Sequence, residues 1–429
     1  MVAFGKIAVD KKTKILYRRS LMEKLAIQGG KPVHSGNWPI WPVYDESEKD
    51  ALMQVLESRV WWRTPGTQTL AFEQEFAGYH QAKYGIAVTN GTAALEVANA
   101  ALGIGPGDEV ILPDFTFIAT ASAVLAAGAM PVLVDCTPDT YCIDPELAEA
   151  AITNRTKAII AVHMGGHPAD LDTLQAICRK HKLFLVEDSA HAHGTEWKGR
   201  KVGAIGDIGT FSFQASKLMT AGEGGIIITN SAELERMARS IHDCGRMPGE
   251  WFYSHFIYGS NYRLSEWQGA ILRCQLRRAD DQRLVRTHNS AYLDRELANI
   301  KGVTPQTEDP RCTSNGHYAY IFHYDRSAFA KLPIARFVEA LNAEGFPTQA
   351  SYPPLHEMAV FQTGEFRKRL SGEQAKQDFP FLQAEFPNTA KAAWETVWLP
   401  QPVLLGSETE MQLVIDAILK IQQHAEDLS

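Results

Sequence analysis

The sequence predicts an α/β protein with a large, mostly parallel sheet sandwiched by helices and a small C-terminal α/β domain. From about residue 85 to 230, short apolar runs rich in β-branched residues alternate with alanine-rich helical runs, which is the pattern of a parallel sheet wrapped by helices. With 429 residues, the chain is too long for one minimal core. After about residue 303 the strand and helix patterns resume on a smaller scale.

The elements of the large sheet follow one another with short connections. The expected strands cover 108–117, with its following loop, 130–136, 157–166, 183–191, 208–213 and 224–230, and the expected helices cover 119–128, 144–154 and 170–182. In such sheets ligands bind at the carboxyl ends of the strands. We therefore expect a site in the loops after Val88, Leu112, Val162, Val186 and Phe213.

The remaining segments suggest three parts. We expect an N-terminal extension and arm over 1–40, a large domain over 41–285 and a small C-terminal domain over 286–429. A long amphipathic run at 270–300 predicts the helix that leaves the large domain. Within the small domain, a strand-like run covers 316–324, and helices are expected near 334–345 and over 407–425.

Composition favours a small-molecule partner. The formal net charge is −8 and the pI is near 6.0, whereas binding of nucleic-acid phosphates needs a concentrated basic face. No run reaches the ~18 consecutive apolar residues of a membrane helix, and the basic N-terminus lacks a secretory h-region. Six scattered cysteines without CxxC pairs fit reduced thiols. We expect a cytoplasmic protein without a bound metal.

Two residues at strand ends predict cofactor chemistry. Asp188 ends the apolar run at 183–188, and Lys217 follows 29 residues later, after another expected strand, so both side chains can meet at one rim of the sheet. A helix or turn cap is the ordinary role of such an aspartate. A buried carboxylate can also keep a pyridine nitrogen protonated, and a lysine can form an imine and then act as a general base, as pyridoxal phosphate (PLP) chemistry requires.

A phosphate site is expected nearby. Asn90, Gly91 and Thr92 lie between an expected strand and helix, where backbone N–H groups and a hydroxyl at a helix N-terminus bind anions. Ser212, just before Lys217, can add a second hydroxyl. An Asn-Gly-Thr turn alone is common, but its combination with Asp188 and Lys217 in this order is not.

Six stretches together resemble the fold-type-I PLP aminotransferases of the DegT and StrS kind, which aminate keto sugars and cyclitols. These stretches are 87–96, 108–120, 157–170, 185–194, 209–225 and 259–272. The resemblance covers about residues 25–425. Within the family, several local stretches are similar to those of 3-amino-5-hydroxybenzoate synthases and of glutamine:scyllo-inosose aminotransferases.

The resemblance implies roles for individual residues. Lys217 matches the lysine that binds PLP covalently, and Asp188 matches the partner of the pyridine nitrogen. The other implied cofactor contacts are Gly91, Thr92 and Ser212 at the phosphate, Phe117 stacked on the ring, His191 beside the phenolic oxygen, and Asn261 at the phosphate of the neighbouring subunit. A phenylalanine at 117 keeps the stacking face but lacks the indole N–H that many relatives have there. The site is therefore expected to be shared within a homodimer.

Substrate contacts are also expected from the resemblance. Trp62 and Arg63 precede a Pro-Gly turn near the expected mouth, and His317 and Tyr352 match stretches that face the substrate. Core packing is the alternative for each of them. His163 and His167 suggest a metal site, but the sequence fixes no carboxylate or cysteine beside them, so turn or substrate contacts are the better interpretation.

The predicted function is PLP-dependent transfer of an amino group from glutamine or glutamate to a ring ketone of a cyclitol or keto sugar. The alternative is a reaction like that of 3-amino-5-hydroxybenzoate synthase, in which water is lost from an aminodehydroshikimate and the ring aromatises. Lys217 serves both reactions. It argues against the family's sugar 3-dehydratases, which have histidine at that position. A non-catalytic PLP-binding protein is a weaker alternative, and the acceptor and the pathway stay open.

Overall fold

The computed structural model describes residues 23–428 apart from 248, 377 and 378. Its central sheet has seven strands in the order β1-β9-β8-β5-β4-β2-β3. Their bounds are β1 Tyr84–Val88, β2 Glu109–Pro113, β3 Met130–Val134, β4 Thr156–Val162, β5 Phe184–Asp188, β8 Ile208–Ser212 and β9 Gly225–Thr229. The strands from β8 to β3 pair in parallel, whereas β9 is antiparallel to both β8 and β1. The predicted α/β class with a mostly parallel sheet is confirmed.

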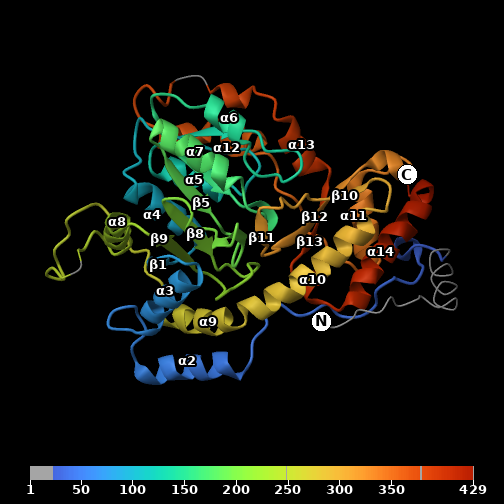
Figure 1. Cartoon of the computed structure of the whole chain (residues 1–429), viewed down its shortest axis with the longest axis horizontal. Coiled ribbons are helices and arrows are strands. Elements are labelled where there is room, and N and C mark those ends of the chain that lie inside the picture. Colours follow the sequence, from blue (N-terminus) through green and yellow to red (C-terminus); the bar gives the residue numbers. More distant parts are fainter. Residues whose placement is uncertain (1–22, 248, 377–378, 429) are drawn as a thin grey trace.

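Helices cover both faces of this sheet (Figure 1). Those of the first two thirds of the chain are α2 Glu46–Ser58, α3 Gln68–Tyr79, α4 Gly91–Ala101, α5 Ala119–Ala126, α6 Pro145–Ala150, α7 Leu171–His181, α8 Ala232–His242 and α9 Glu266–Arg277. Several begin at side-chain caps that the sequence encodes. Asn90 accepts from the Ala93 N–H at the start of α4, and Asp144 caps α6, whose first residue is Pro145. Such caps pair N–H groups that lack partners within the helix.

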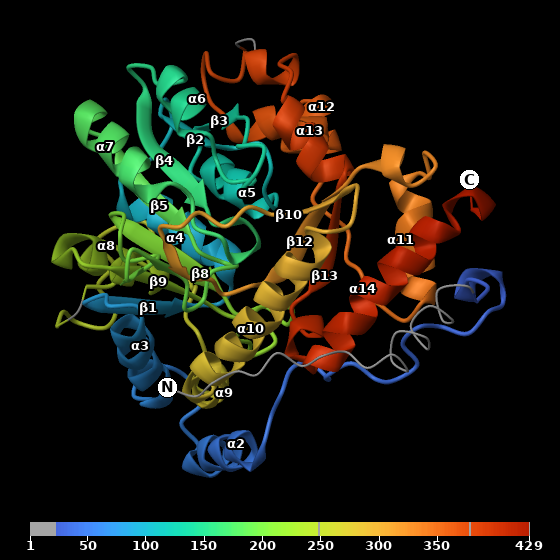
Figure 2. The same cartoon turned by 45° about the vertical axis from the view of Figure 1, so that its right-hand side comes forward.

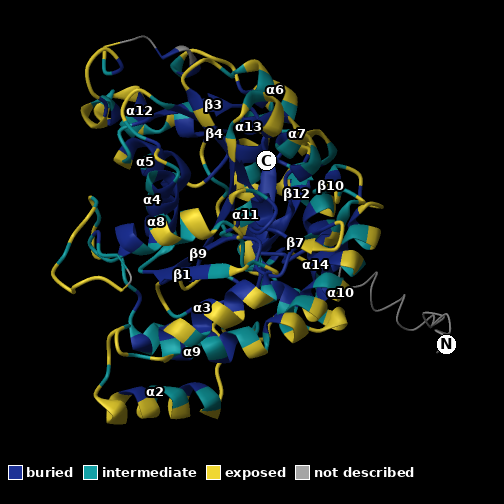
Figure 3. Cartoon of the chain, turned by 60° about the vertical axis from the view of Figure 1, so that its left-hand side comes forward, coloured by how far each residue is buried: buried dark blue, intermediate teal, exposed yellow. Residues whose placement is uncertain are grey.

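The strands are buried on both faces, as Figure 3 shows by their dark colour. Alternate residues of β1 separate to opposite sides: Ile86 and Val88 pack with α4 and α5, and Ala87 packs with α3. A strand that is buried on both faces reads as a nearly continuous apolar run. The apolar runs of the sequence therefore reflect this sandwich.

A second, antiparallel sheet of three strands forms the core of the C-terminal part with three long helices (Figure 2). The elements are β10 Val303–Pro305, β12 Ala319–Tyr324, β13 Thr396–Pro400, α10 Ala279–Leu297, α11 Ile334–Ala343 and α14 Glu408–Gln423. Leu25 from the N-terminal segment completes this core. Between β12 and β13, the described residues from 355 to 376 and from 379 to 386, which include α12 Ala359–Gln362, pack on α5 and on β3 of the large sheet. Helix α13 Pro387–Trp394 follows.

The run at 270–300 forms two helices instead of one. Arg278 separates α9 from α10, and its guanidinium pairs with Asp45 (2.8 Å) and with Glu48 of α2. The proposed boundary at residue 285 lies inside α10, which runs from the large sheet to the small one (Figure 1).

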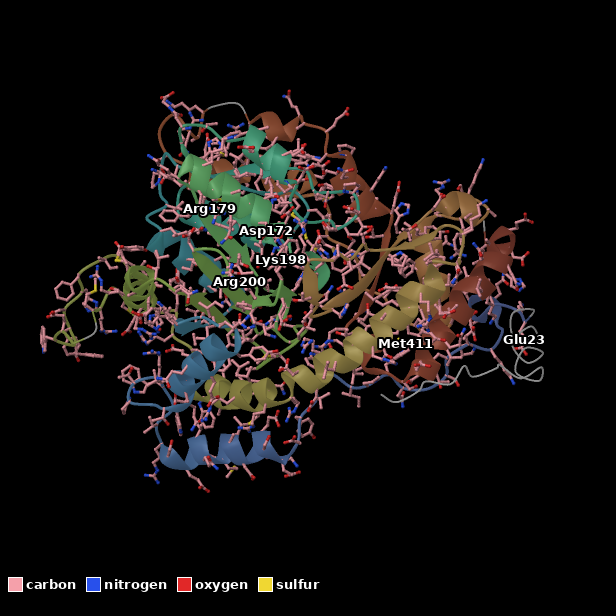
Figure 4. All side chains as sticks on the ribbon, in the orientation of Figure 1. Glu23, Asp172, Arg179, Lys198, Arg200 and Met411 are labelled. Atoms are coloured by element: carbon pink, nitrogen blue, oxygen red, sulfur yellow. The ribbon has the colours of Figure 1, made fainter. Side chains whose placement is uncertain are left out.

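A third small sheet was not expected from the sequence. The hairpin of β6 Glu196–Trp197 and β7 Arg200–Lys201 pairs with β11 Cys312–Ser314. Figure 4 shows Lys198 of this hairpin beside Asp172 of α7, with which it forms an ion pair. This sheet brings the chain after residue 312 back to the carboxyl edge of the large sheet.

The N-terminal segment links the two sheets. Of the extension predicted over 1–40, residues 1–22 lie outside the described part of the structure. Trp38 donates its indole N–H to the Gly345 carbonyl in the C-terminal part, and Trp41 donates to the Ala215 carbonyl beside the large sheet. Among the described residues, no helix is long and apolar enough to span a membrane.

Candidate active site

A cavity of about 720 Å³ lies at the carboxyl ends of β4, β5 and β8, where the N-terminus of α4 also points. Val162, Asp188 and Ser212 mark the ends of these strands, and all three line the cavity. This is the rim that the parallel-sheet rule selects. Both Asp188 and Lys217 lie in its walls.

Lys217 is held by a loop that folds back on β8. The Phe213 N–H donates to the Gly224 carbonyl at 2.8 Å, and the Thr220 hydroxyl donates to the Phe213 carbonyl at 2.9 Å. Gly222 has φ 81°, a conformation that glycine adopts without strain. Burial lowers the pKa of Lys217 to about 8, although the Asp188 carboxylate opposes this shift. The free amine is therefore accessible near neutral pH.

Asp188 ends β5 and is 6% exposed. One carboxylate oxygen accepts from the Thr120 hydroxyl at 2.9 Å, and the other accepts from the Ala190 N–H at 3.3 Å. Burial raises the pKa of Asp188, while the Thr120 hydrogen bond and the Lys217 ammonium oppose that rise. A cationic ring nitrogen in the cavity would stabilise the carboxylate in its charged form.

The N-terminus of α4 and the end of β8 approach each other closely. A Cβ on Gly91 would lie 2.7 Å from the Ser212 Cβ, and a Cβ on Gly225 would lie 2.4 Å from the Asn90 carbonyl oxygen. Side chains larger than hydrogen do not fit at either position. The two glycines thus bring the Ser212 hydroxyl and the first N–H groups of α4, including that of Thr92, to one wall of the cavity, an arrangement that binds phosphate.

Aromatic rings form another part of the cavity wall. Phe117 is 54% exposed, although it is a large apolar side chain, and its ring centroid lies 5.8 Å from that of Tyr352. The Tyr352 hydroxyl lies 3.1 Å from Nε2 of His191. His191 also stacks on Tyr318, with centroids 4.0 Å apart. Burial, with Lys217 nearby, lowers the pKa of His191 well below its ordinary value, so this imidazole is neutral at pH 7.

These residues fit PLP. The cofactor needs an amine, a carboxylate for its ring nitrogen, a phosphate site and an aromatic face. Lys217, Asp188, the Gly91–Ser212 approach and Phe117 line one cavity that can hold a group of this size. Moreover, Nδ1 of His191 is buried and has no hydrogen-bond partner within the described residues. A polar group of a bound cofactor can supply the partner that such an atom lacks.

Four residues predicted to contact cofactor or substrate lie outside this cavity. Asn261 is exposed on the segment after α8, and Trp62 packs its ring against Phe252. Arg63 makes two hydrogen bonds, of 3.1 and 2.8 Å, with the buried carboxylate of Glu73. The structure therefore does not bring these residues to the Lys217 cavity of their own chain.

His317, the fourth of these residues, is buried and has φ 53°. It lines a separate cavity of about 20 Å³ with Asp294 and Glu308. The next residue, Tyr318, is the one that reaches the Lys217 cavity. The left-handed backbone at His317 turns its side chain away from the cavity that Tyr318 lines.

The histidines of the stretch 163–170 have protein partners. His163 lies 3.2 Å from the Glu187 carboxylate and accepts from the Ala169 N–H. His167 accepts from the Asp309 N–H at 2.9 Å. Glu187 also accepts from the backbone of Gly203 and Ile205. These contacts fix the loops behind Asp188, which is a structural role.

Sequence reasoning missed several residues of the cavity. Thr120 and Tyr318 contact the Asp188 and Lys217 side chains, while Glu96, Glu223 and Tyr262 line the cavity near α4. The backbone carbonyl of Glu223 accepts from the Gln268 side chain. Thr120, Glu96, Glu223 and Tyr262 lie in stretches that carry the resemblance, whereas Tyr318 lies outside them.

Comparisons with known proteins agree with this geometry. The model of the DegT/DnrJ/EryC1/StrS aminotransferase family matches residues 42–419. The L-glutamine:2-deoxy-scyllo-inosose aminotransferase of Streptoalloteichus tenebrarius is 39% identical over 419 residues, which are 94% of this chain and 99% of that protein. The 3-amino-5-hydroxybenzoate synthase of Amycolatopsis mediterranei is 40% identical over 395 residues, which are 89% and 98% of the two chains.

Solved structures give the same result. A crystal structure of 3-amino-5-hydroxybenzoic acid synthase superposes with a TM-score of 0.83 at 39% identity, covering 91% of this chain and 99% of that one. The structure of an aminotransferase from Psychrobacter cryohalolentis superposes with a TM-score of 0.79 at 31% identity, covering 89% and 98%.

Proposed function

The chain belongs to the DegT/DnrJ/EryC1/StrS aminotransferase family, and from that premise we propose that it transfers an amino group from glutamine or glutamate to a ring ketone of a cyclitol or keto sugar. The observation that carries the proposal is one cavity with Lys217 and Asp188 in its walls and the N-terminus of α4 at its edge. The names of several relatives, which specify glutamine and a scyllo-inosose, support the donor and the acceptor class.

We assign the cofactor contacts to residues that line this cavity. Gly91, Thr92 and Ser212 would hold the phosphate, and Phe117 would cover the ring. Asp188 would pair with the ring nitrogen and His191 with the phenolic oxygen. Bound there, PLP supplies an electron sink that stabilises negative charge beside the transferred nitrogen.

Lys217 acts in this proposal as nucleophile and as general acid and base. With a pKa of about 8, its amine gains and loses a proton near neutral pH, which suits proton transfer. Thr120 keeps the Asp188 carboxylate aimed into the cavity through its hydrogen bond. Tyr352 holds His191 from the side of the C-terminal domain. The donor and the acceptor bind in turn at the same place, because Lys217 must reach both.

A second copy of the chain would complete the site. Among the described residues that line the cavity, Lys217 is the only lysine or arginine, and Glu96, Asp188 and Glu223 are acidic. The cofactor phosphate and the donor carboxylate are both anions, so further cationic or amide groups are needed. Exposed aromatic side chains, which a partner can cover, follow α8: Trp251, Phe252, Tyr253, Phe256 and Tyr258. We therefore propose a homodimer in which Asn261 reaches the phosphate in the other subunit.

A mixing experiment tests the shared site. Lys217→Ala and Asn261→Ala variants, each inactive alone, are unfolded, mixed and refolded together. If the site is shared in a two-fold dimer, the mixed dimer contains one site without either change, and about a quarter of wild-type activity returns. If both residues served the site of their own chain, every site would carry one change and no activity would return.

The cofactor proposal has its own test. We expect the purified protein to carry visible absorbance from PLP that shifts when glutamine is added. Lys217→Ala should block the conversion of PLP to its amine form because the group that moves the proton is lost, whereas Lys198→Ala, which removes a surface ion pair with Asp172, should leave the conversion intact. Full turnover by Lys217→Ala would refute the proposal.

The 3-amino-5-hydroxybenzoate synthase reaction is the second candidate. The identity of 40% to one such synthase and the TM-score of 0.83 to a solved one favour it as much as the inosose relatives favour amino transfer. Product analysis separates the two. Incubation with glutamine and a scyllo-inosose should give an aminocyclitol, while an aminodehydroshikimate should be returned unchanged. Aromatic product from the latter would favour the synthase reaction.

A further inference from the structure

Tyr318 contacts the amine of Lys217 directly. The Lys217 Nζ atom lies over the face of the Tyr318 ring, 4.5 Å from its centroid. A cation in this position is attracted by the negative face of the ring. The contact joins two parts of the chain that are far apart in sequence, since Tyr318 lies just before β12 and Lys217 lies after β8.

The Tyr318 ring is fixed on both sides. Its hydroxyl lies 3.0 Å from the Ser216 hydroxyl, next to Lys217 in the chain. Its other contact is His191, which stacks at 4.0 Å with an angle of 13° between the rings. The Tyr318 N–H donates to the Gly165 carbonyl at 2.9 Å, and the residue is 6% exposed. The ring is therefore a rigid wall of the cavity.

The other groups near the Lys217 ammonium stabilise it less directly than the Tyr318 ring does. Asp188 is the acidic group that raises the pKa of Lys217, but no hydrogen bond joins the two side chains among the described residues. His191 and His193 also lie near the amine, and burial lowers the pKa of both well below the ordinary value. Both imidazoles are thus neutral and do not repel the ammonium.

We propose that Tyr318 is a positioning residue that holds the Lys217 ammonium against its ring face at the cavity wall whenever this amine has no covalent bond to the cofactor. A lysine side chain is long and flexible. Without the ring face, the amine loses this attraction, and its charged form is less stable at the cavity wall. The proposal rests on the proposed function, because it concerns the free form of Lys217 that moves protons.

The test measures the proton affinity of Lys217 in the full chain freed of cofactor. Acetylation by acetic anhydride is followed across a range of pH, and the modified Lys217 peptide is quantified by mass spectrometry against the Lys198 peptide. Loss of the ring face removes a stabilisation of the charged amine, so Tyr318→Leu should lower the midpoint of Lys217 labelling by about one pH unit.

A graded series of substitutions keeps the test valid if Tyr318→Leu does not fold. Tyr318 is replaced by phenylalanine and by phenylalanines with increasing numbers of ring fluorines, which keep the shape but weaken the negative ring face. The midpoint should fall stepwise along the series. Tyr320→Phe is the matched control. The Tyr320 hydroxyl donates to the Asp294 carboxylate at 2.7 Å, and Tyr320 does not line the Lys217 cavity. In this variant the midpoint of Lys217 labelling should equal that of wild type.

The outcomes are decisive in both directions. A stepwise fall supports the proposal, and a flat series, or a folded Tyr318→Leu variant with the wild-type midpoint, overturns it. Because labelling needs neither bound PLP nor substrate, its result is independent of the absorbance and product tests of the proposed function. The experiments can therefore show that one proposal fails while the other holds.

Discussion

Two lysines, Lys217 in the large sheet's cavity and Lys420 in the C-terminal domain, lie among protein atoms but have opposite surroundings. The Lys420 ammonium, 1% exposed, donates to the Glu344 carboxylate and to the Lys31 carbonyl, each at 3.0 Å. Glu344 in turn accepts from the N–H groups of Ala26 and Val33. Lys217 has a ring face and an open cavity instead.

These surroundings predict a stabilising role for Lys420 and fit the reactive role proposed for Lys217. A buried ion pair with its remaining hydrogen bonds satisfied holds its charge. Lys420 thereby joins α14 to the N-terminal segment and to the residue after α11. A buried amine without a bonded carboxylate has a lowered pKa and becomes a nucleophile. The same substitution at the two sites should therefore have opposite consequences.

The largest effect is expected on amino transfer. Lys217→Met should reduce it by about 10³-fold or more, since both the nucleophile and the general base are lost. Lys420→Met should keep wild-type turnover per folded molecule. Initial rates of glutamine consumption, normalised to the folded fraction from circular dichroism, compare the two. Equal losses in both variants would contradict the contrast.

The loss of folding stability should be larger for Lys420→Met than for Lys217→Met. Lys420→Met leaves the buried Glu344 carboxylate without its cation, which should lower the free energy of unfolding by about 3–5 kcal/mol. Urea unfolding measures this loss. The double variant Lys420→Met with Glu344→Gln serves as the control, because removal of both charges should restore much of the stability. If Lys420→Met alone had wild-type stability, the unpaired Glu344 carboxylate would not destabilise the fold.

The effect of pH sharpens the comparison at Lys217. Its pKa falls from the ordinary 10.5 to about 8 on folding, so below pH 8 the cofactor-free protein buries a charge that the unfolded chain solvates. The cost is lifted as pH rises from 8 to 10.5, where the folded state has released the proton and the unfolded state has not. Lys217→Met should therefore raise the free energy of unfolding by about 1–2 kcal/mol below pH 8, allowing for the opening to solvent.

Urea titrations of the cofactor-free proteins at several pH values give this difference directly. The gain from Lys217→Met should shrink between pH 8 and 10.5 and vanish above that range. Lys198→Met, at an exposed ion pair, provides the control with no comparable trend. A gain that is constant with pH would mean that the buried charge is not its cause.

Much of the fold and of the central site could be predicted from the sequence because the signals are local. The strand ends at Asp188 and before Lys217, and the Asn90 cap of α4, are each contained in a few residues. The positions of Tyr318 and Thr120 could not be found this way. Tyr318 reaches Lys217 through the pairing of β11 with β6, and contacts between residues about a hundred apart leave no periodic pattern in the sequence.

Contacts between distant residues also explain the other features that the sequence did not predict. The interruption of the 270–300 run at Arg278 depends on ion pairs with α2, more than 200 residues earlier in the chain. The Lys420 pair with Glu344 spans 76 residues. Arg63, His317 and Trp62 match family stretches, but the structure places them outside the cavity of their own chain, and their predicted contacts with substrate stay predictions.

The smallest expected effect concerns the hydroxyl of Tyr352, which lies on the segment that the C-terminal part extends over the cavity. His356 and Asp114, 2.6 Å apart, join this segment to the loop before Phe117. Tyr352→Phe keeps the ring but removes the bond to His191 Nε2. One hydrogen bond is worth about 0.5–1.5 kcal/mol, so kcat/KM should fall by about 3–10-fold.

Tyr324→Phe is the matched control in the C-terminal core. The Tyr324 hydroxyl donates to the Leu332 carbonyl at 3.0 Å, and neither residue lines the cavity. Its loss should lower stability by a similar amount and leave kcat/KM unchanged, because the bond orients no group in the cavity. If both variants lost activity equally, the hydroxyl of Tyr352 would contribute to folding alone. The aromatic wall of the cavity would then stabilise the protein as the C-terminal core does, without orienting the reacting groups.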